Sequence, residues 1–506
     1  MTSPSTTRRP NILLIHADQL RYDALGCTGN PAARTPNLDR LAAAGTTCTR
    51  HIAANPVCMP SRASLFTGLY PPAHNVWNNG VALPRQEYAR YTRHNAVRKF
   101  QPEPTTLADC FADAGYDTAS FGKLHLTPNL APAECGYPET WANWADEAMD
   151  GWHGPYYGFR DVDLTEGHGE QPCRQGHYAR WLKTNHPGVA KAVRDGGARR
   201  PVEGLNDLYA SPVPHELHNT TWLAERFASY IEHERPTDRP FFAFIGFPDP
   251  HHPFTPSFDV LEEFLDADPP APIDPTGEAW NAYSDFREVS RNSIAHLPPD
   301  AWRAIRRYTL AQTCQIDRAV GRILAALEAS GVADETAVVF TSDHGDYLGD
   351  HGLLRKSHCA CDALLHVPFI LHAPFAAGLP TEIAAATSNC DVLPTLADLA
   401  GIPAPAGLDG RSLLDSAHAP ASEHAAFAFS ANGEPEVQNY TVYDDRYRLT
   451  WYPNTGFVEL YDHRDDPGEC LNVANQQPQR VADMQDRIRE RLALSYHPIL
   501  KREGAW

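Results

Sequence analysis

Cys58 lies in the segment PVCMPSRASLFTGLYP, whose residue types and spacing predict a nucleophile at the start of a helix. Pro60 can begin a helix, and the free amides and dipole of a helix N-terminus stabilise negative charge. Arg62, one turn further on, could point back toward position 58 and bind an oxyanion. The alternative is a buried structural cysteine followed by an ordinary surface arginine, which is the commoner arrangement for an arbitrary cysteine.

Polar clusters follow four short apolar runs of the chain, NILLIH, TASF, FFAFIGF and ETAVVFTS. The clusters are Ala17-Asp18-Gln19, Gly122-Lys123-Leu124-His125, Pro248-Asp249-Pro250-His251 and Asp343-His344-Gly345. Continuous apolar runs of this kind are typical of strands in a sheet that is buried on both faces. Ligands of open α/β sheets bind beyond the carboxyl ends of the strands, so we expect the clusters to converge on one site.

Helix signals lie between these runs. In TPNLDRLAAAG, Thr35 is placed to cap a helix, Pro36 occupies its first position and Gly45 follows its last turn. A longer helix is predicted from about Trp302 to Ser330, with Gly331 as its stop. Strands that alternate with helices predict an α/β fold with a large mixed, mostly parallel sheet flanked by helices.

The pattern also predicts how the chain is divided. We expect a catalytic domain over residues 1–420 and a smaller C-terminal subdomain over residues 421–506, in which alternating runs predict an antiparallel sheet and a polar helix around 480–492. Residues from about 141 to 218 show no sustained period and predict a long insertion near the site mouth, or an ordinary packed excursion. Their aromatics, in HGPYYGF and GHYARWL, could form a sugar or aryl platform or belong to the core.

The segment CMPSR resembles the signature of the sulfatase family, within the alkaline phosphatase superfamily, in which this cysteine is oxidised after translation to formylglycine. TPNLDRLAAAG, SRASLFTGLYP, SDHGDYLGDHG, VPFIL and ELYDHRDDPGE also resemble typical sulfatase segments, so the resemblance covers almost the whole chain. It implies hydrolysis of small-molecule sulfate esters to alcohol and inorganic sulfate, by a formylglycine made from Cys58. It also implies a formylglycine-generating enzyme as the maturation partner.

By the same resemblance, Asp18, Gln19, Asp343 and His344 hold one divalent cation together with the formylglycine at position 58. Ca²⁺ prefers oxygen donors, which most of these groups supply. Gln19 stands where many sulfatases have a second aspartate, and His344 where many have asparagine. Because most of the donors are oxygens, we expect Ca²⁺ first. Imidazole suits Mn²⁺ or Zn²⁺ better than Ca²⁺, so Mn²⁺ is the alternative.

Four further residues match positions of the sulfatase site. Lys123 and His125 resemble the pair beside the nucleophile, where a lysine can hold a sulfate oxygen and a histidine can accept a hydroxyl proton. His251, in PDPHHPF, and Lys356, in LLRKSH, resemble the residues that contact the sulfate and the leaving oxygen, where a general acid is needed. The neighbouring His252 stays open as an alternative to His251.

Two other groups are weaker candidates. Asn79, in VWNNGV, resembles a substrate-binding asparagine of some relatives, although Asn78 fits equally well and Asn-Asn-Gly is also an ordinary turn. A dense group of histidines and cysteines has a spacing that fits no common zinc pattern. Its members are His358, Cys359, Cys361 and His366.

Composition limits the classes of function. A formal net charge of -20 disfavours nucleic acid as a partner. The apolar stretch near the N-terminus is too short for a signal sequence or a membrane span, and 11 irregularly spaced cysteines suggest reduced thiols, so we expect a cytoplasmic protein. Two alternatives stay open: a phosphonate monoester hydrolase or phosphodiesterase of the same superfamily, which Gln19 and His344 also resemble, and a non-catalytic binding protein in which Cys58 remains a thiol. The segment GKLH favours a sulfatase over the first.

Overall fold

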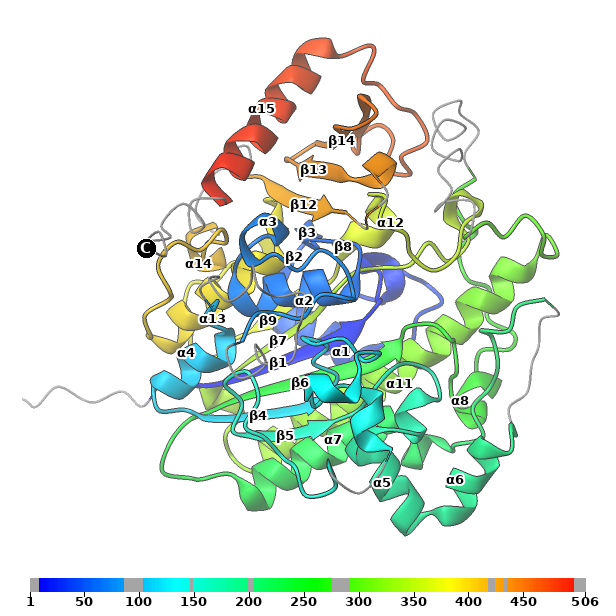
Figure 1. Ribbon diagram of the computed structural model, residues 1–506, viewed down its shortest axis with the longest axis vertical. Coiled ribbons are helices and arrows are strands. Elements are labelled where there is room, and N and C mark those ends of the chain that lie inside the picture. Colours follow the sequence, from blue (N-terminus) through cyan, green and yellow to red (C-terminus); the bar gives the residue numbers. More distant parts are fainter. Residues whose placement is uncertain are drawn as a thin grey trace, which may run out of the picture.

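The computed structural model describes residues 9–85, 103–145, 149–197, 204–274, 292–416, 424–431, 433 and 435–495. Its centre is an eight-stranded sheet in the order β10-β2-β9-β7-β1-β6-β4-β5 (Figure 1). The strands are β1 (Asn11–Asp18), β2 (Thr46–Cys48), β4 (Asp117–Gly122), β5 (Asp161–Leu164), β6 (Phe241–Pro250), β7 (Thr336–Ser342), β9 (Phe369–His372) and β10 (Glu382–Ile383). Strands β7, β1, β6, β4 and β5 run parallel, whereas β9 is antiparallel to β7 and β2. The predicted mixed, mostly parallel sheet is therefore confirmed.

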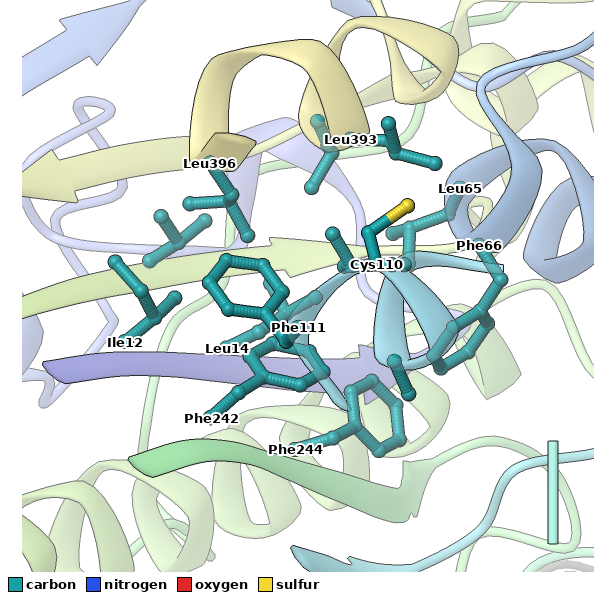
Figure 2. Packing of buried hydrophobic residues seen from close by; sticks show 14 of the residues in the cluster. Ile12, Leu14, Leu65, Phe66, Cys110, Phe111, Phe242, Phe244, Leu393 and Leu396 are labelled. Carbon is teal, nitrogen blue, oxygen red and sulfur yellow. The ribbon is translucent and has the colours of Figure 1, made fainter. Parts of the chain in front are cut away.

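Strand β1 shows why the predicted runs are continuously apolar. Successive side chains of a strand point to opposite faces of the sheet. Ile12 and Leu14 pack on one face with α2 (Cys58–Thr67), α4 (Leu107–Asp113) and α13 (Val392–Ala400), as Figure 2 shows. Leu13 and Ile15 pack on the other face with α1 (Pro36–Ala44), α7 (Asn219–Ser229) and α11 (Ala301–Ala329). Helices thus cover both faces, and the helix that carries Cys58 is fixed to the sheet through Leu65 and Phe66.

Helix α1 begins at Pro36 and Thr35 occupies its N-cap position, both as predicted, although the Thr35 side chain does not cap the helix. The Thr35 hydroxyl accepts from the Gly26 N–H at 2.8 Å and donates to Asp39 at 3.0 Å, so it makes no capping bond to the helix backbone. Gly45 does follow the last turn. A Cβ at Gly45 would lie 2.4 Å from the Leu371 carbonyl oxygen, so this glycine allows the backbone to pass close to β9.

The C-terminal part contains an antiparallel sheet of β12 (Ala426–Ser430), β13 (Asn439–Tyr443), β14 (Tyr447–Tyr452) and β15 (Phe457–Asp462), in that order. Helix α15 (Pro478–Ser495) packs on it through Met484 and Ile488, at the top of Figure 1. This agrees with the predicted sheet and closing helix. The predicted domain boundary at residue 420 lies outside the described residues.

A buried ion pair connects this sheet to the main domain. Arg448 of β14 donates to both oxygens of Glu469. Glu469 also accepts from the backbone N–H of Asp362, at 2.9 Å, where helix α12 (Asp362–Leu365) begins. The C-terminal sheet therefore supports the segment of the main domain that follows Lys356.

The segment predicted as an insertion, residues 141–218, contains regular structure in its described part. It supplies the edge strand β5, the helices α5 (Gly176–Asn185) and α6 (Pro187–Arg194), and the short turns η5 (Trp141–Trp144), η7 (Gln171–Cys173) and η8 (His215–Leu217). Tyr156, Tyr157, Phe159 and Tyr178 are all buried. These aromatics belong to the core, so they do not form a platform for substrate.

The remaining elements are short. They are β3 (His51–Ile52), β8 (His366–Val367) and β11 (Thr387–Ser388), which form a three-stranded sheet, and η1 (Tyr22–Ala24), α3 (Pro71–His74), η4 (Ala133–Cys135), η9 (Tyr230–Glu234), α8 (Phe258–Glu262), η10 (Ala333–Glu335), η11 (Asp350–Gly352), η12 (Asn389–Asp391), α14 (Leu413–Ser416) and η14 (Pro435–Val437). Among the described helices, none has a stretch long and apolar enough to cross a membrane.

Candidate active site

The predicted polar clusters meet at one edge of the main sheet. Strands β7, β1, β6 and β4 are neighbours, and their carboxyl ends carry Asp343, Asp18, His251 and Lys123, respectively. The N-terminus of α2 reaches the same edge, because Cys58 lies beside Asp18 and His344. This is the position at which open α/β sheets bind their ligands.

Cys58 is the first residue of α2 and is fully buried. Its Sγ lies 3.1 Å from Lys356 Nζ, 3.3 Å from His344 Nε2 and 3.8 Å from Asp18 Oδ1. Burial and Asp18 oppose ionisation of the thiol, whereas Lys356 and Lys123 favour it, and the net effect lowers the pKa of Cys58. Position 58 is therefore built to hold negative charge.

Arg62 is fully buried, so it is not a surface arginine. Its guanidinium donates to Asp18 at 2.9 Å and Asp343 at 2.8 Å, and to the backbone carbonyl of Lys123 at 2.8 Å. Three of its N–H donors are directed at these acceptors, and the binding of an oxyanion by Arg62 stays a prediction. Arg62 fixes the relative positions of three strands' ends.

The predicted cation ligands form a compact group. Ligand atoms of Asp18, Cys58, Asp343 and His344 all lie within 4.8 Å of one another. Burial opposes ionisation of Asp18, but Lys123 and Arg62 outweigh it and hold the pKa of Asp18 well below its usual range. Carboxylate oxygens with one imidazole nitrogen are a suitable donor set for a divalent cation, so these residues fit the cofactor that the sequence implies.

Gln19 directs its amide oxygen toward the same group. Its Oε1 accepts from Lys356 Nζ at 2.9 Å, while its Nε2 donates to Asp346 and lies 3.0 Å from His252 Nδ1. The Gln19 backbone N–H donates to Asp343 at 2.9 Å. Asp346, which the sequence analysis did not single out, therefore orients Gln19.

Lys123 and His125 follow β4 and are both buried. The ammonium of Lys123 contacts Asp18 Oδ2. The backbone N–H of His125 donates to Glu139, a buried carboxylate that also accepts from Leu126 at 2.8 Å. Glu139 fixes the loop that carries His125, and the sequence analysis missed it because its only signal is a single glutamate in an irregular segment.

Lys356 and His251 form a close pair, with Nζ 2.6 Å from His251 Nε2. The Nδ1 of His251 contacts the backbone carbonyl of His252. Burial, together with His168 and Lys356, holds the pKa of His251 well below its ordinary value, which keeps the ring neutral. Of the two adjacent histidines, His251 faces Lys356 and His252 faces Gln19.

His168 also lies in this site, and the sequence analysis did not name it. It follows β5, and its Nε2 contacts Lys123 Nζ. Its ring stacks on His251 with centroids 3.5 Å apart. The rule that found the other clusters, polar residues after a strand, would have found His168 if β5 had been recognised.

Asn79 lies at the N-terminus of α2, where its Oδ1 accepts from the backbone N–H of Met59 at 3.0 Å. Asn78 instead accepts from Gly80 at 2.8 Å, within its own turn. Asn79 is therefore the asparagine beside position 58.

The His/Cys group lies elsewhere. His358 bonds to Ser430 at 3.0 Å, and His366 Nε2 lies 3.0 Å from the Thr49 carbonyl oxygen. Cys359 and Cys361 are buried. In the described part of the chain, none of these residues belongs to a group with metal-ligand spacing.

Sulfatase family models and sulfatase relatives match nearly the whole chain. The family model described as Sulfatase matches residues 10–402, and a second, described as N-sulphoglucosamine sulphohydrolase, C-terminal, matches residues 349–496. An arylsulfatase of Clostridium perfringens is 27% identical over 480 residues, covering 92% of this chain and 90% of the relative. The multifunctional alkaline phosphatase superfamily protein PehA of Trinickia caryophylli is 30% identical over 429 residues, covering 80% of this chain and 76% of PehA.

Solved structures show the same fold. The phosphonate monoester hydrolase of Agrobacterium radiobacter superposes with a TM-score of 0.77 at 27% identity, covering 96% of each chain. A structure described as a 2-O GAG sulfatase has a TM-score of 0.66 at 21% identity, covering 98% of this chain and 94% of the other. Since the Sulfatase model spans residues 10–402 and the predicted site residues meet within that range, the chain belongs to the sulfatase family and is a sulfuric ester hydrolase.

Proposed function

We propose that this protein hydrolyses small-molecule sulfate esters with a formylglycine made from Cys58 as nucleophile and one divalent cation as cofactor. The observation that supports this most strongly is the position of Cys58 Sγ, 3.1 Å from Lys356 Nζ and 3.3 Å from His344 Nε2. In the mature enzyme a hydroxyl of hydrated formylglycine would take the place of this sulfur. The cationic surroundings would favour its ionised form, which is the stronger nucleophile.

A sulfate ester already carries negative charge, so an anionic nucleophile is repelled unless cations surround the sulfur. Lys356 contacts Cys58, and Lys123 contacts the neighbouring Asp18, so both lysines would supply part of that field. The charge of Arg62 is balanced by Asp18 and Asp343, so its part is to hold these carboxylates.

Asp18, Gln19, Asp343 and His344 would hold the cation. When bound, a divalent cation polarises the ester and lowers the pKa of a coordinated hydroxyl. Oxygen donors favour Ca²⁺, and the imidazole of His344 keeps Mn²⁺ as the alternative.

The leaving alcohol needs a proton, which the Lys356–His251 pair would give. The Nδ1 of His251 faces the His252 carbonyl oxygen, which requires a proton on Nδ1. The lone pair of Nε2 then accepts from the Lys356 ammonium at 2.6 Å. The proton of this pair would pass to the departing oxygen as the bond between sulfur and that oxygen breaks.

His125 would act in the second half of the reaction. Its Nδ1 is buried and, among the described residues, has no hydrogen-bond partner. Burial, with Lys123 and Arg62 nearby, holds the pKa of His125 well below its ordinary value, so the ring is neutral and can accept a proton. Removal of the proton from the second hydroxyl of residue 58 would expel sulfate and re-form the aldehyde without attack by water.

The test combines protein chemistry with turnover. The protein is expressed together with a formylglycine-generating enzyme. Mass spectrometry of the peptide from Pro56 to Arg62 should then show an aldehyde in place of the thiol. Cys58→Ala and Cys58→Ser should abolish release of inorganic sulfate from an aryl sulfate while thermal unfolding is unchanged. Cys27→Ser, at an exposed cysteine, is the matched control. Active protein with an unmodified Cys58 thiol would contradict the proposal.

A second candidate is phosphonate monoester hydrolysis, which the similarity to the Agrobacterium radiobacter enzyme supports. The segment GKLH, which contains Lys123 and His125, resembles the sulfatase pattern and favours the sulfatase. A comparison of kcat/KM for an aryl sulfate and the matching aryl phosphonate monoester distinguishes the two, since the native substrate class should have the higher value.

A further inference from the structure

The loop after β5 holds His168 in a defined position. Gly167 and Gly169 on either side have φ values of +79° and +58°, a left-handed region that glycine adopts most readily. The backbone N–H of His168 donates to Gln171 Oε1 at 3.0 Å. A Cβ at Gly169 would lie 3.2 Å from Pro253, so the loop packs against the segment that follows His251.

The side chain of His168 contacts two parts of the site at once. Its Nε2 faces the ammonium of Lys123, and its ring lies parallel to that of His251, at an interplanar angle of 11° and a centroid separation of 3.5 Å. The His168 side chain is 18% exposed, whereas that of Lys123 is 2% exposed, so His168 lies nearer to the solvent. His168 therefore contacts both Lys123 and His251.

The group of Asp18, Cys58, His168 and His251 has metal-ligand spacing. It is nevertheless a poor site for a second cation. Lys123 contacts both Asp18 and His168, and Lys356 contacts both Cys58 and His251. Two ammonium groups therefore already occupy the donor atoms, and a further dication would lie between them. The site favours an anion.

Lys123 has three N–H donors, and within the described residues its side chain contacts Asp18 and His168. Two acceptors fix the direction of the third donor. A lysine held in this way can meet a sulfate oxygen without losing the rotamer freedom that a long side chain otherwise gives up on binding.

We propose that His168 is a positioning residue with two separable tasks: its Nε2 directs Lys123 at the sulfate group, and its ring holds the orientation of His251 beside the leaving oxygen. This inference rests on the proposed function. The tasks belong to different atoms, so different substitutions should remove them one at a time.

His168→Phe keeps a flat ring for the stack and removes the acceptor. We expect inorganic sulfate to inhibit this variant roughly tenfold more weakly, and kcat/KM to fall by a similar factor for every aryl sulfate, whatever its leaving group. His168→Gln keeps an acceptor near Nε2 and removes the ring. We expect its sulfate inhibition to stay close to wild type and its kcat/KM to fall more steeply as the leaving alcohol becomes less acidic, because weaker leaving groups depend more on proton donation.

The experiment measures kcat/KM for a series of aryl sulfates of graded leaving-group acidity, with inhibition by inorganic sulfate, in wild type, His168→Phe, His168→Gln and His168→Ala. The Ala variant should show both defects. His233→Ala and His233→Gln, at a histidine whose side chain is 72% exposed, are matched controls. Formylglycine content and thermal unfolding are measured for each protein, and activities are compared per formylglycine.

A purely structural role would lower all activities equally without changing the leaving-group dependence or the sulfate inhibition, and would overturn the inference. The inference would also be overturned if wild type is active and His168→Ala has the same kcat/KM values and the same sulfate inhibition. Wild-type protein that carries formylglycine and releases no sulfate would contradict the proposed function and this inference with it.

Discussion

The side-chain amide of Gln19 donates through Nε2 to the carboxylate of Asp346. An ionised carboxylate only accepts hydrogen bonds, so it selects one of the two orientations of the amide. Oε1 consequently points at Lys356 Nζ, 2.9 Å away, on the side of the predicted cation ligands. The amide of Gln19, in place of a carboxylate, removes a charge from the predicted ligand set. Asp346 ensures that the amide oxygen still faces the predicted cation ligands.

Replacement of Asp346 should therefore weaken cation binding. We expect Asp346→Ala to lower the affinity for Ca²⁺ or Mn²⁺ by about tenfold to a hundredfold, and Asp346→Asn by less, because its carbonyl oxygen can still accept from Gln19. Calorimetric titration of chelator-treated protein measures the affinity directly. Asp238→Ala, at a side chain that is 73% exposed, is the control. Equal affinity in Asp346→Ala and wild type would rule out this orienting role.

His344 should set which cation is preferred. His344→Asn exchanges an imidazole nitrogen for an amide oxygen, and oxygen donors favour the harder cation. We expect the ratio of Ca²⁺ affinity to Mn²⁺ affinity to rise in this variant, in the same titration, with His233→Asn as the control. A ratio that stays constant or falls would show that His344 is not a ligand.

Arg62 should contribute more to the free energy of unfolding when the cation is absent. Its removal leaves Asp18 and Asp343 buried without their partner, and loss of one side of a buried ion pair costs about 3–5 kcal/mol. A bound cation would compensate part of that charge. We expect Arg62→Met to lower the free energy of unfolding by about that amount with chelator and by clearly less with Ca²⁺.

Urea unfolding under the two conditions checks this difference. Arg239→Met, at a side chain that is 48% exposed, should change the free energy of unfolding by less than about 0.5 kcal/mol. Equal destabilisation of Arg62→Met with and without cation would argue against a shared charge.

The sheet and most of the site could be predicted because their signals are local. The apolar runs of β1, β4, β6 and β7 are continuous because these strands are buried on both faces, and each ends directly before its polar cluster. Strand β5 was missed because it has four residues, Asp161–Leu164, of which two are aspartates, and it pairs on one side only. With it, His168 was missed.

The roles of Arg62, Asp346 and Glu139 could not be predicted either, and the reason is different from that for β5. Residue type and position say that Arg62 can bind an anion, but its acceptors Asp18 and Asp343 are 44 and 281 residues away in sequence. Asp346 and Glu139 act through hydrogen bonds to other site residues. Such partners depend on tertiary packing, which no local pattern encodes.

His74, at the end of α3, links stability to pH away from the catalytic groups. Its Nδ1 accepts from the backbone N–H of Val76 at 3.0 Å, and its Nε2 lies 2.9 Å from Ser64 Oγ. Burial lowers the pKa of His74 from 6.5 to about 3. The folded protein therefore keeps a neutral ring at pH values where the unfolded chain takes up a proton.

The sign of the effect follows from that difference. The unfolded state binds more protons below pH 6.5, so the contribution of His74 to stability is complete above that pH and is lost as the pH falls toward about 3. His74→Asn keeps an acceptor for Val76 and cannot titrate. Its free energy of unfolding should fall less steeply than that of wild type between about pH 6.5 and pH 5, by a difference in slope that approaches about 1.4 kcal/mol per pH unit at the lower end of this range. Urea unfolding across this range measures both slopes, and His233→Asn should keep the wild-type slope because that imidazole is exposed. Parallel slopes for wild type and His74→Asn would show that the buried His74 ring does not couple folding to pH.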